Sequence, residues 1–308
     1  MRFMSPIEGQ SFTIAPGGDA PSIDFASDAS GAHVWDWSIR WGSHHQSGQA
    51  RTPDNRWDAR AAIANLGGTL DVRARSARGE ATITARIVGA NPSPEAVTRF
   101  LAAQPGSDGF TRIVAQESRY RHFDAHGEPV RAFDGGCGLC QLTTPAPTFA
   151  QAWSWKRNLE AGLALFAAKR AAAHTWLGQS GRIFTGEQLT REAVCRWNGG
   201  RYHVWDGARW SRPATIVCDT RAGNIGWDMG DPANHGHSEA ALHARDAASY
   251  ARPPLATARW HYHGVCYADH VLGPPPALSG SRAISAARAP RADGSRAARV
   301  DARTRPPG

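Results

Sequence analysis

Four short segments in the middle of the chain combine residue types that could carry out acid–base chemistry on a bound ligand. The first contains a carboxyl side chain, Glu117, and a carboxyl group can donate a proton to a leaving oxygen if its surroundings keep it protonated. The others supply amides, which can bind an N-acetyl group, and glycines, which let backbone approach a ligand. In chain order, the segments are Gln116-Glu117-Ser118-Arg119, Gly135 to Leu142, Asn158-Leu159-Glu160-Ala161-Gly162 and Arg196-Trp197-Asn198-Gly199-Gly200.

Glu117 stands at the end of a predicted helix over about 109–120, in which Phe110, Ile113 and Val114 share an apolar face. A carboxyl group at a helix end facing a partly apolar cleft loses solvation of its charged form, which raises its pKa. An isolated Glu-Ser pair is more often an exposed helix end. Together with the other three segments, it indicates a general acid.

In order and spacing, the four segments resemble the lytic transglycosylase family of the lysozyme-like superfamily. That family's pattern is a helix ending in Glu-Ser, then Gly-Leu-Met-Gln, Asn-(Ile/Val)-x-x-Gly and Tyr-Asn-x-Gly. The resemblance covers roughly residues 97–272. It implies a mainly α lysozyme-like domain in which Glu117, as general acid/base, cleaves the β-1,4 bond between N-acetylmuramic acid and N-acetylglucosamine of peptidoglycan. It implies neither a cofactor nor a metal.

The chain departs from the family pattern at two positions. Cys140 replaces the usual Met, which a small polarizable thiol can do in a core. Trp197 replaces the Tyr whose hydroxyl would bond to Glu117, so Tyr202 is a candidate substitute donor. Asn158 is expected to fix a helix start or a loop, and Gly162 to permit close helix packing. The predicted substrate-binding residues are Ser118, Gly138, Leu139, Gln141, Trp197, Asn198 and Tyr202.

The number of carboxylates separates two reactions. A lytic transglycosylase needs one carboxyl group, because the 6-hydroxyl of the sugar closes an anhydro ring. A hydrolase usually needs a second, and Asp134 and Asp124 are the candidates. Asp134-Gly135-Gly136 is similar to a loop of goose-type lysozymes, although Asp before Gly is also common turn chemistry. A non-catalytic glycan-binding or structural protein on the lysozyme fold is the third candidate.

The elements around these segments predict an α+β multidomain chain. Up to about residue 88, short runs of period two alternate with Gly, Pro, Asp and Ser clusters, typical of an all-β, immunoglobulin-like sandwich. Trp35, Trp37, Ile39 and Trp41 share one strand face, which we expect to be core rather than an open aromatic platform. The expected strands are Thr13-Ile14, Ile23 to Phe25, Val34 to Trp41, Leu70 to Ala74 and Ala81 to Val88.

Ala90-Asn91-Pro92-Ser93-Pro94 predicts a linker, after which the apolar spacing becomes helical. Ser93 is a candidate cap for a helix that Pro94 opens. Further helices are expected at about 109–120, 155–174 and 188–197. The predicted domains are a β module over 1–91, a lysozyme-like domain over 92–272 and a disordered Arg/Ala/Pro-rich tail over 273–308.

The formal charge of +8 is concentrated in that tail, which has seven arginines and two aspartates. A basic tail could bind nucleic acid, but we expect a solvated tail and no nucleic-acid partner. No stretch approaches the ~20 apolar residues of a membrane helix, and Met1 to Pro6 lack the apolar run of a signal peptide. We therefore expect cytoplasmic synthesis without a Sec signal, and action in the periplasm or wall after export, injection or lysis, with a secretion apparatus or phage tail as candidate partner.

Five cysteines, at positions 137, 140, 195, 218 and 266, leave at least one outside any internal disulfide. Without a signal peptide we expect mostly reduced, buried thiols. Cys137-x-x-Cys140 has no second pair at zinc-finger spacing. His235-x-His237 and His261-x-His263 have no ordered third ligand, so no metal site is predicted.

Overall fold

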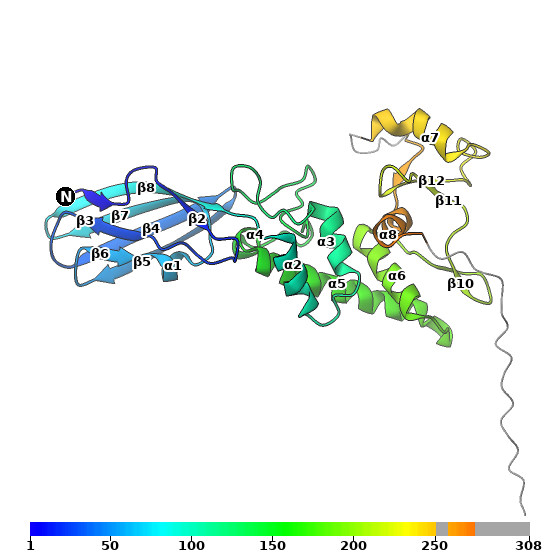
Figure 1. Ribbon diagram of the computed structural model, residues 1–308, viewed down its shortest axis with the longest axis horizontal. Helices are drawn as coiled ribbons and strands as arrows, with labels where there is room; N and C mark the ends of the chain where they lie inside the picture. Colours follow the sequence, from blue (N-terminus) through cyan, green and yellow to red (C-terminus); the bar gives the residue numbers. More distant parts are fainter. Residues whose placement is uncertain (251–257, 275–308) are drawn as a thin grey trace, which may run out of the picture. The chain divides into compact units, whose positions relative to one another are not determined.

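The computed structural model describes residues 1–250 and 258–274, and within them the chain is α+β, with eight α-helices and four β-sheets (Figure 1). Met1–Pro274 form one compact unit. The tail predicted over 273–308 lies, beyond Pro274, outside the described residues. Every helix among the described residues is too short or too polar to span a bilayer.

The N-terminal strands form two sheets. The five-stranded sheet has the order β2-β8-β7-β4-β5, in which β2 runs parallel to β8 and every other pair is antiparallel. The second sheet, β1-β3-β6, is antiparallel, and a short helix, α1 (Arg60–Ile63), follows it. The strands are β1 (Phe3–Ser5), β2 (Ser11–Ile14), β3 (Asp24–Ser27), β4 (His33–Trp41), β5 (His44–Thr52), β6 (Arg56–Asp58), β7 (Gly68–Ser76) and β8 (Gly79–Gly89).

The aromatic face of β4 is core, as predicted. Burial alternates along the strand, and Trp35, Trp37, Ile39 and Trp41 are all buried. The ring of Trp35 lies 6.1 Å from that of Trp57 on β6, so side chains of the two sheets interdigitate. A buried face of this kind is not an open platform for a ligand.

The structure contains strands that the hydrophobic pattern did not reveal. β5 is mostly polar and mostly exposed, and it is an edge strand that pairs only with β4. Edge strands commonly carry polar side chains, which hide them from a period-two search. β1 and β6 have only three residues each, too few to establish a period.

The four predicted helices are present: α2 (Pro94–Ala102), α3 (Phe110–Ser118), α5 (Trp155–Leu177) and α6 (Gly186–Asn198). Ser93 caps α2 by accepting a hydrogen bond from the Ala96 backbone. Four helices were not predicted: α1, α4 (Phe149–Trp153), α7 (Glu239–Asp246) and α8 (Gly264–Leu272). Residues of α3, α5, α6 and α8 form one apolar core, with the ring of Phe110 packed on Phe166 and Trp197.

Short strands lie between α6 and α8. β9 (Val204–Trp205) pairs with β10 (Trp210–Ser211), and β11 (Ile216–Cys218), β12 (Ile225–Asp228) and β13 (His261–Tyr262) form a three-stranded antiparallel sheet. Trp227, Leu242 and Trp260 make a small core under this sheet. Two 3-10 turns, Gln179–Gly181 and Ala247–Ser249, complete the described elements.

Side chains from both sides of residue 91 share one apolar core. Trp153 packs edge-on against Trp41, and Gly67 has no room for a side chain because Trp153 covers it. The division into domains near residue 91 stays a prediction. What the structure describes there is the change of element, from β8 ending at Gly89 to α2 beginning at Pro94.

The expectation of reduced thiols is wrong for one pair. Cys218, the last residue of β11, is bonded to Cys266 on α8, with the Cα atoms 5.3 Å apart. The two are 48 residues apart in sequence, a separation that gave no pairing signal. Cys137, Cys140 and Cys195 are free and buried.

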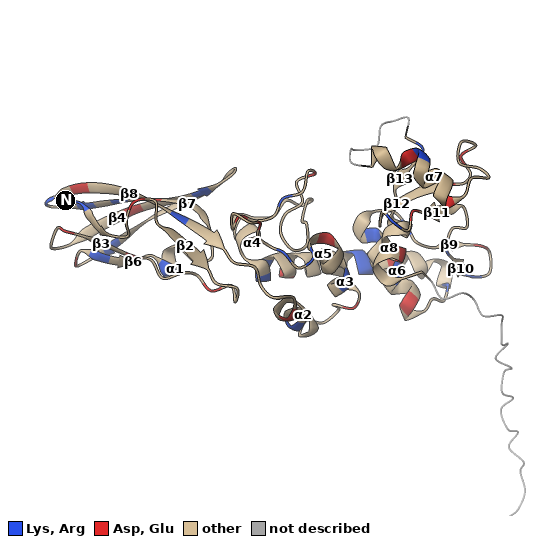
Figure 2. Cartoon of the chain, turned by 45° about the horizontal axis from the view of Figure 1, so that its top comes forward, with Lys and Arg blue, Asp and Glu red and all other residues tan. Residues whose placement is uncertain are grey.

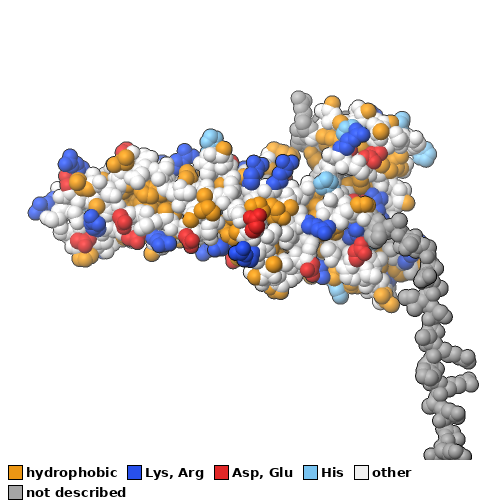
Figure 3. Space-filling model, viewed as in Figure 1, with side chains coloured by type: hydrophobic (Ala, Val, Ile, Leu, Met, Phe, Trp, Pro, Cys, Tyr) orange, Lys and Arg blue, Asp and Glu red, His pale blue; other side chains and the backbone are white. Residues whose placement is uncertain are grey.

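Charged side chains of both signs are distributed over strands and helices (Figure 2). On the visible face of the space-filling view, small apolar patches are interrupted by polar and charged atoms (Figure 3). Basic and acidic side chains both appear on that face (Figure 3).

Candidate active site

A cleft of about 660 Å³ contains Glu117 and residues from three of the predicted segments. The end of α3, the loop before α4 and the end of α6 form one side of it. Residues around β12 and β13 supply the rest of the lining. The lining residues are Glu117, Ala132, Phe133, Asp134, Gln141, Thr143, Trp197, Asn198, Ala222, Asn224, Ile225, Tyr250 and Tyr262.

Glu117 is held by the last turn of α3. Phe110, Ile113 and Val114 are fully buried, which fixes the rotation of the helix. Arg119 then ends the helix with a positive φ of 51°. The carboxyl group therefore sits where a short helix stops.

Two neutral donors bond to the same oxygen of Glu117. The Tyr267 hydroxyl donates to Oε1 at 2.5 Å, and the Trp197 indole Nε1 donates to Oε1 at 3.1 Å. Both donors occupy Oε1, which leaves Oε2 as the oxygen that can carry the acid proton when Glu117 is protonated.

The pKa of Glu117 is raised above the ordinary glutamate value. Burial is the largest cause, because it disfavours the charged form. The bonds from Tyr267 and Trp197 oppose it, and the negative charge of Asp134 adds to it. Glu117 consequently keeps its proton to higher pH than an exposed glutamate would.

The loop from Gly138 to Gln141 is held by hydrogen bonds to Asn158, which is fully buried. Its Oδ1 accepts from the Cys140 backbone at 2.9 Å, and its Nδ2 donates to the Cys137 carbonyl at 3.2 Å. Gly138 has a φ of +74°, and a Cβ there would meet Asn158 and His122. His122 accepts a bond from the Leu139 backbone, and burial lowers its pKa to about 3, so it stays neutral. The expectation that Asn158 fixes a loop agrees with these bonds.

Gly162 lets α5 approach this loop. A Cβ at Gly162 would lie 2.5 Å from the Cys140 sulfur and 2.8 Å from the Phe110 ring. Cys140 is therefore a packing residue beneath the loop, as expected. Burial raises its thiol pKa and raises that of Cys137 to about 11, so both thiolates are disfavoured and the Cys-x-x-Cys pair lacks the activation of a redox motif.

Five of the residues singled out from the sequence meet in the cleft: Glu117, Asp134, Gln141, Trp197 and Asn198. The Gln141 amide donates to the Gly138 carbonyl at 2.8 Å, so its carbonyl oxygen is left for other partners. Trp197, the replacement for the family's Tyr, itself bonds to Glu117. The Asn198 Oδ1 is buried and lacks a hydrogen-bond partner among the described residues.

Four predicted substrate-binding residues do not line the cleft. The Ser118 hydroxyl donates to the Val114 carbonyl of its own helix, and Leu139 is fully buried in the core. Gly138, the first residue of the loop, packs against His122 and Asn158. Tyr202 is buried and donates to Asp269 at 2.6 Å, so it is not the substitute donor to Glu117.

Of the two candidate second carboxylates, only Asp134 lies in the cleft. Asp124 accepts bonds from the His126 and Glu128 backbones, which makes it a turn residue, and it lines a different hollow. Asp124 therefore does not share the cleft with Glu117. The Asp134 Oδ1 accepts from the Gly136 backbone at 3.1 Å, so Asp134 combines turn chemistry with a place beside Glu117.

Tyr267 and the cleft residues around β12 and β13 were not among the predicted site residues. Tyr267 was visible as a residue with a polar end inside an apolar stretch, and such residues need a buried partner. Tyr250 and Tyr262 stand among scattered Trp, Gly and Pro residues, where no period marks an element. Phe133 also lines the cleft, with 82% of its surface exposed. It was not predicted as a site residue, although its neighbour Asp134 was.

Of the four paired histidines, one caps a helix and the other three are exposed. His263 caps α8 by accepting from the Val265 backbone, and His235 and His237 are exposed. No group of three or more His, Cys, Asp or Glu among the described residues could hold a metal ion.

Comparison of the chain with protein-family models, curated proteins and solved structures gave no match. The resemblance to lytic transglycosylases accordingly depends on the four sequence segments alone.

Proposed function

We propose that the protein is a peptidoglycan lytic transglycosylase that cleaves the β-1,4 bond between N-acetylmuramic acid and N-acetylglucosamine. Glu117 is the general acid that protonates the bridging oxygen and then the base that accepts the proton of the sugar's 6-hydroxyl. The proposal includes a lysozyme-like fold for the helical part and an immunoglobulin-like sandwich for the N-terminal strands.

The observation that carries the proposal is the state of Glu117. It is a carboxyl group of raised pKa, in a cleft lined by Gln141 and Asn198, with both neutral donors on one oxygen. This arrangement supports proton donation from Oε2, and a single such group suffices for the transglycosylase reaction. The test is to incubate the purified protein and its Glu117→Gln variant with peptidoglycan and to analyse the released muropeptides.

The second candidate is a hydrolase that uses Asp134 as the base for a water molecule. Asp134 lies in the same cleft and its charge contributes to the raised pKa of Glu117. Inverting glycosidases place two carboxyl groups so that a water fits between acid and base. Its products would carry ordinary reducing ends, whereas those of a transglycosylase are lighter by one water.

Asp134→Asn separates the two reactions. The amide keeps an oxygen for the Gly136 backbone but removes the charge that raises the pKa of Glu117. That pKa should fall, so the decline of activity at high pH should begin at lower pH. We expect kcat to stay within about tenfold for a transglycosylase, whereas loss of a hydrolytic base should cost at least about a hundredfold. A pH–rate profile with product mass analysis makes the distinction.

Phe133→Ala tests the aromatic residue at the mouth of the cleft. A phenyl ring that is 82% exposed contributes little to the core, and sugar rings stack on aromatic faces. We expect KM for glycan strands to rise about three- to tenfold with kcat little changed, since uniform binding is lost. Ile183→Ala, at a site 89% exposed and outside the cleft, is the matched control. Equal KM values for both variants would exclude a role for Phe133 in binding.

A further inference from the structure

We propose that the Cys218–Cys266 disulfide is a positioning element for the catalytic acid, because it fixes the turn of α8 from which Tyr267 reaches Glu117. The effect on activity depends on the proposed function. The effect on the hydrogen bond to Glu117 does not, and it can be measured separately.

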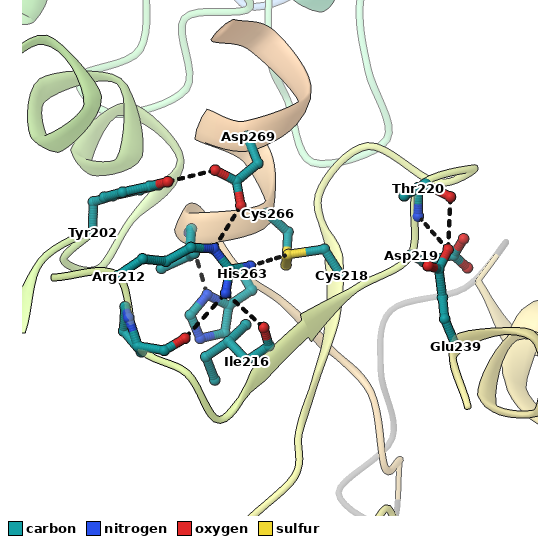
Figure 4. Close-up of a disulfide and its surroundings, with 12 residues drawn as sticks. Tyr202, Arg212, Ile216, Cys218, Asp219, Thr220, Glu239, His263, Cys266 and Asp269 are labelled. Carbon is teal, nitrogen blue, oxygen red and sulfur yellow. Dashed lines mark hydrogen bonds and ion pairs between the residues drawn. A yellow bond between two sulfur atoms is a disulfide. The ribbon is translucent and has the colours of Figure 1, made fainter. Parts of the chain in front are cut away.

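The covalent link and the donor are adjacent in the chain. Cys266 and Tyr267 are consecutive residues on the first turns of α8, and both are buried. Cys266 is bonded to Cys218 at the end of β11, and Tyr267 donates to Glu117 at 2.5 Å. Figure 4 shows the bond joining the helix to the strand, with Arg212 beside it. Because the two residues are adjacent on one turn of α8, a displacement of Cys266 also displaces Tyr267.

The start of α8 also supports the second donor. Gly264 has no room for a Cβ, because the backbone of Cys195 and Gly199 at the end of α6 lies against it. Trp197, which donates to Glu117, lies between these two residues. The packing of Gly264 on α6 thus supports the Trp197 donor, whereas the disulfide holds the next residues of α8, which carry Tyr267.

The small sheet to which Cys218 belongs also contributes to the far wall of the cleft. β11 pairs with β12 and β12 with β13, and Ile225 and Tyr262 on these strands line the cleft. Gly226 on β12 lies so close to the Cys266 sulfur that a Cβ would be 2.6 Å from it. The disulfide consequently joins α8, which carries Tyr267, to the sheet from which Ile225 and Tyr262 line the cleft.

A second attachment explains why loss of the disulfide would act locally rather than unfold the helix. Asp269, one turn beyond Cys266, accepts bonds from Arg212 at 2.8 Å and from Tyr202 at 2.6 Å (Figure 4). Val265 and Ala268 are fully buried in the main core. α8 should therefore stay packed and Glu117 should stay buried, while the geometry of the Tyr267 bond relaxes. A hydrogen bond weakens steeply with distance and angle, so a small shift suffices.

The redox step is an ordinary thiol–disulfide exchange with a dithiol reductant. One thiolate of the reductant attacks a sulfur of the pair, the bond between Cys218 and Cys266 breaks, and a mixed disulfide forms. The second thiol of the reductant resolves it. Two electrons pass to the protein, two cysteine thiols form, and the reductant leaves as its own disulfide. A reducing compartment would hold the enzyme in its less active form.

The test compares oxidised and reduced protein in two backgrounds, wild type and Tyr267→Phe. In wild type, reduction should lower kcat about tenfold and move the high-pH decline of activity to higher pH, because the bond that lowers the pKa of Glu117 is lost. In Tyr267→Phe the same reduction should have an effect of less than about twofold. The other titratable groups that influence Glu117 or share its cleft lie outside α8 and are unchanged in all four samples; they are Asp134, Cys140, Tyr250 and Tyr262. Equal losses in both backgrounds, or an unshifted profile, would overturn the proposal.

Carbon-13 NMR titration of the Glu117 carboxyl group gives a readout that needs no activity, with Glu117→Gln for assignment. The expected result is a higher Glu117 pKa after reduction, in the direction that Tyr267→Phe also produces. If oxidised wild type does not cleave peptidoglycan, the proposed function fails while this titration still decides the positioning. The Cys218→Ala, Cys266→Ala double variant should have the same Glu117 pKa as reduced wild type, and reductant should not change it. An unchanged pKa, or unfolding of reduced wild type in near-ultraviolet circular dichroism, would mean that the disulfide only stabilises the fold.

Discussion

Glu117→Gln should lose about a hundredfold to ten-thousandfold of the glycan-cleaving rate, the range that a positioned general acid contributes. The amide has nearly the same shape, and its oxygen can still accept the bonds from Trp197 and Tyr267. It has no acidic proton to donate. The release of soluble muropeptides from purified peptidoglycan measures the loss.

A matched control is Glu160→Gln on the exposed face of α5, which should keep the wild-type rate. Melting curves should show both variants folded. If Glu117→Gln cleaved as fast as wild type, Glu117 would not be the acid. If wild type and variant were equally inactive but both bound glycan, a binding protein on this fold would be favoured.

Asn158→Leu should give the largest loss of stability. The leucine has the same branching and number of side-chain heavy atoms but cannot pair with the buried backbone of Cys140 and Cys137 or with the Gln151 carbonyl. Leaving buried polar groups unpaired costs the desolvation of each, so we expect the free energy of unfolding to fall by about 3 kcal/mol. Urea unfolding followed by tryptophan fluorescence measures it.

Gln46→Leu, at an exposed position on β5, should change the free energy of unfolding by less than about 0.5 kcal/mol. Asn158→Leu should also reduce activity in the protein that remains folded, because the loop that carries Gln141 loses its hydrogen bonds to Asn158. A variant as stable as wild type would show that this loop is held by other contacts.

Local patterns predicted the elements that bury a regular face. The alternation of Trp35, Trp37 and Trp41 identified β4, and the cap at Ser93 placed the start of α2. Polar edge strand β5 and the elements beyond Trp205 were missed, because their residues carry no period. The Cys218–Cys266 bond joins elements 48 residues apart, which no local signal encodes.

The site residues were predicted only where they belong to a segment with recognisable spacing. Glu117, Gln141, Trp197 and Asn198 belong to segments with recognisable spacing, and the structure places them in one cleft. Tyr202 was chosen as donor because it lies near Trp197 in sequence, but its hydroxyl is occupied by Asp269. Tyr267 takes that role from 70 residues beyond Trp197, and only the packing of α8 on α6 brings it there.

The most direct test of the account is mass spectrometry of the muropeptides that the oxidised protein releases from peptidoglycan. We predict products lighter by one water than those of a hydrolase, present with wild type and absent with Glu117→Gln. Products of the same mass and amount from both proteins, or none from folded wild type, would contradict it.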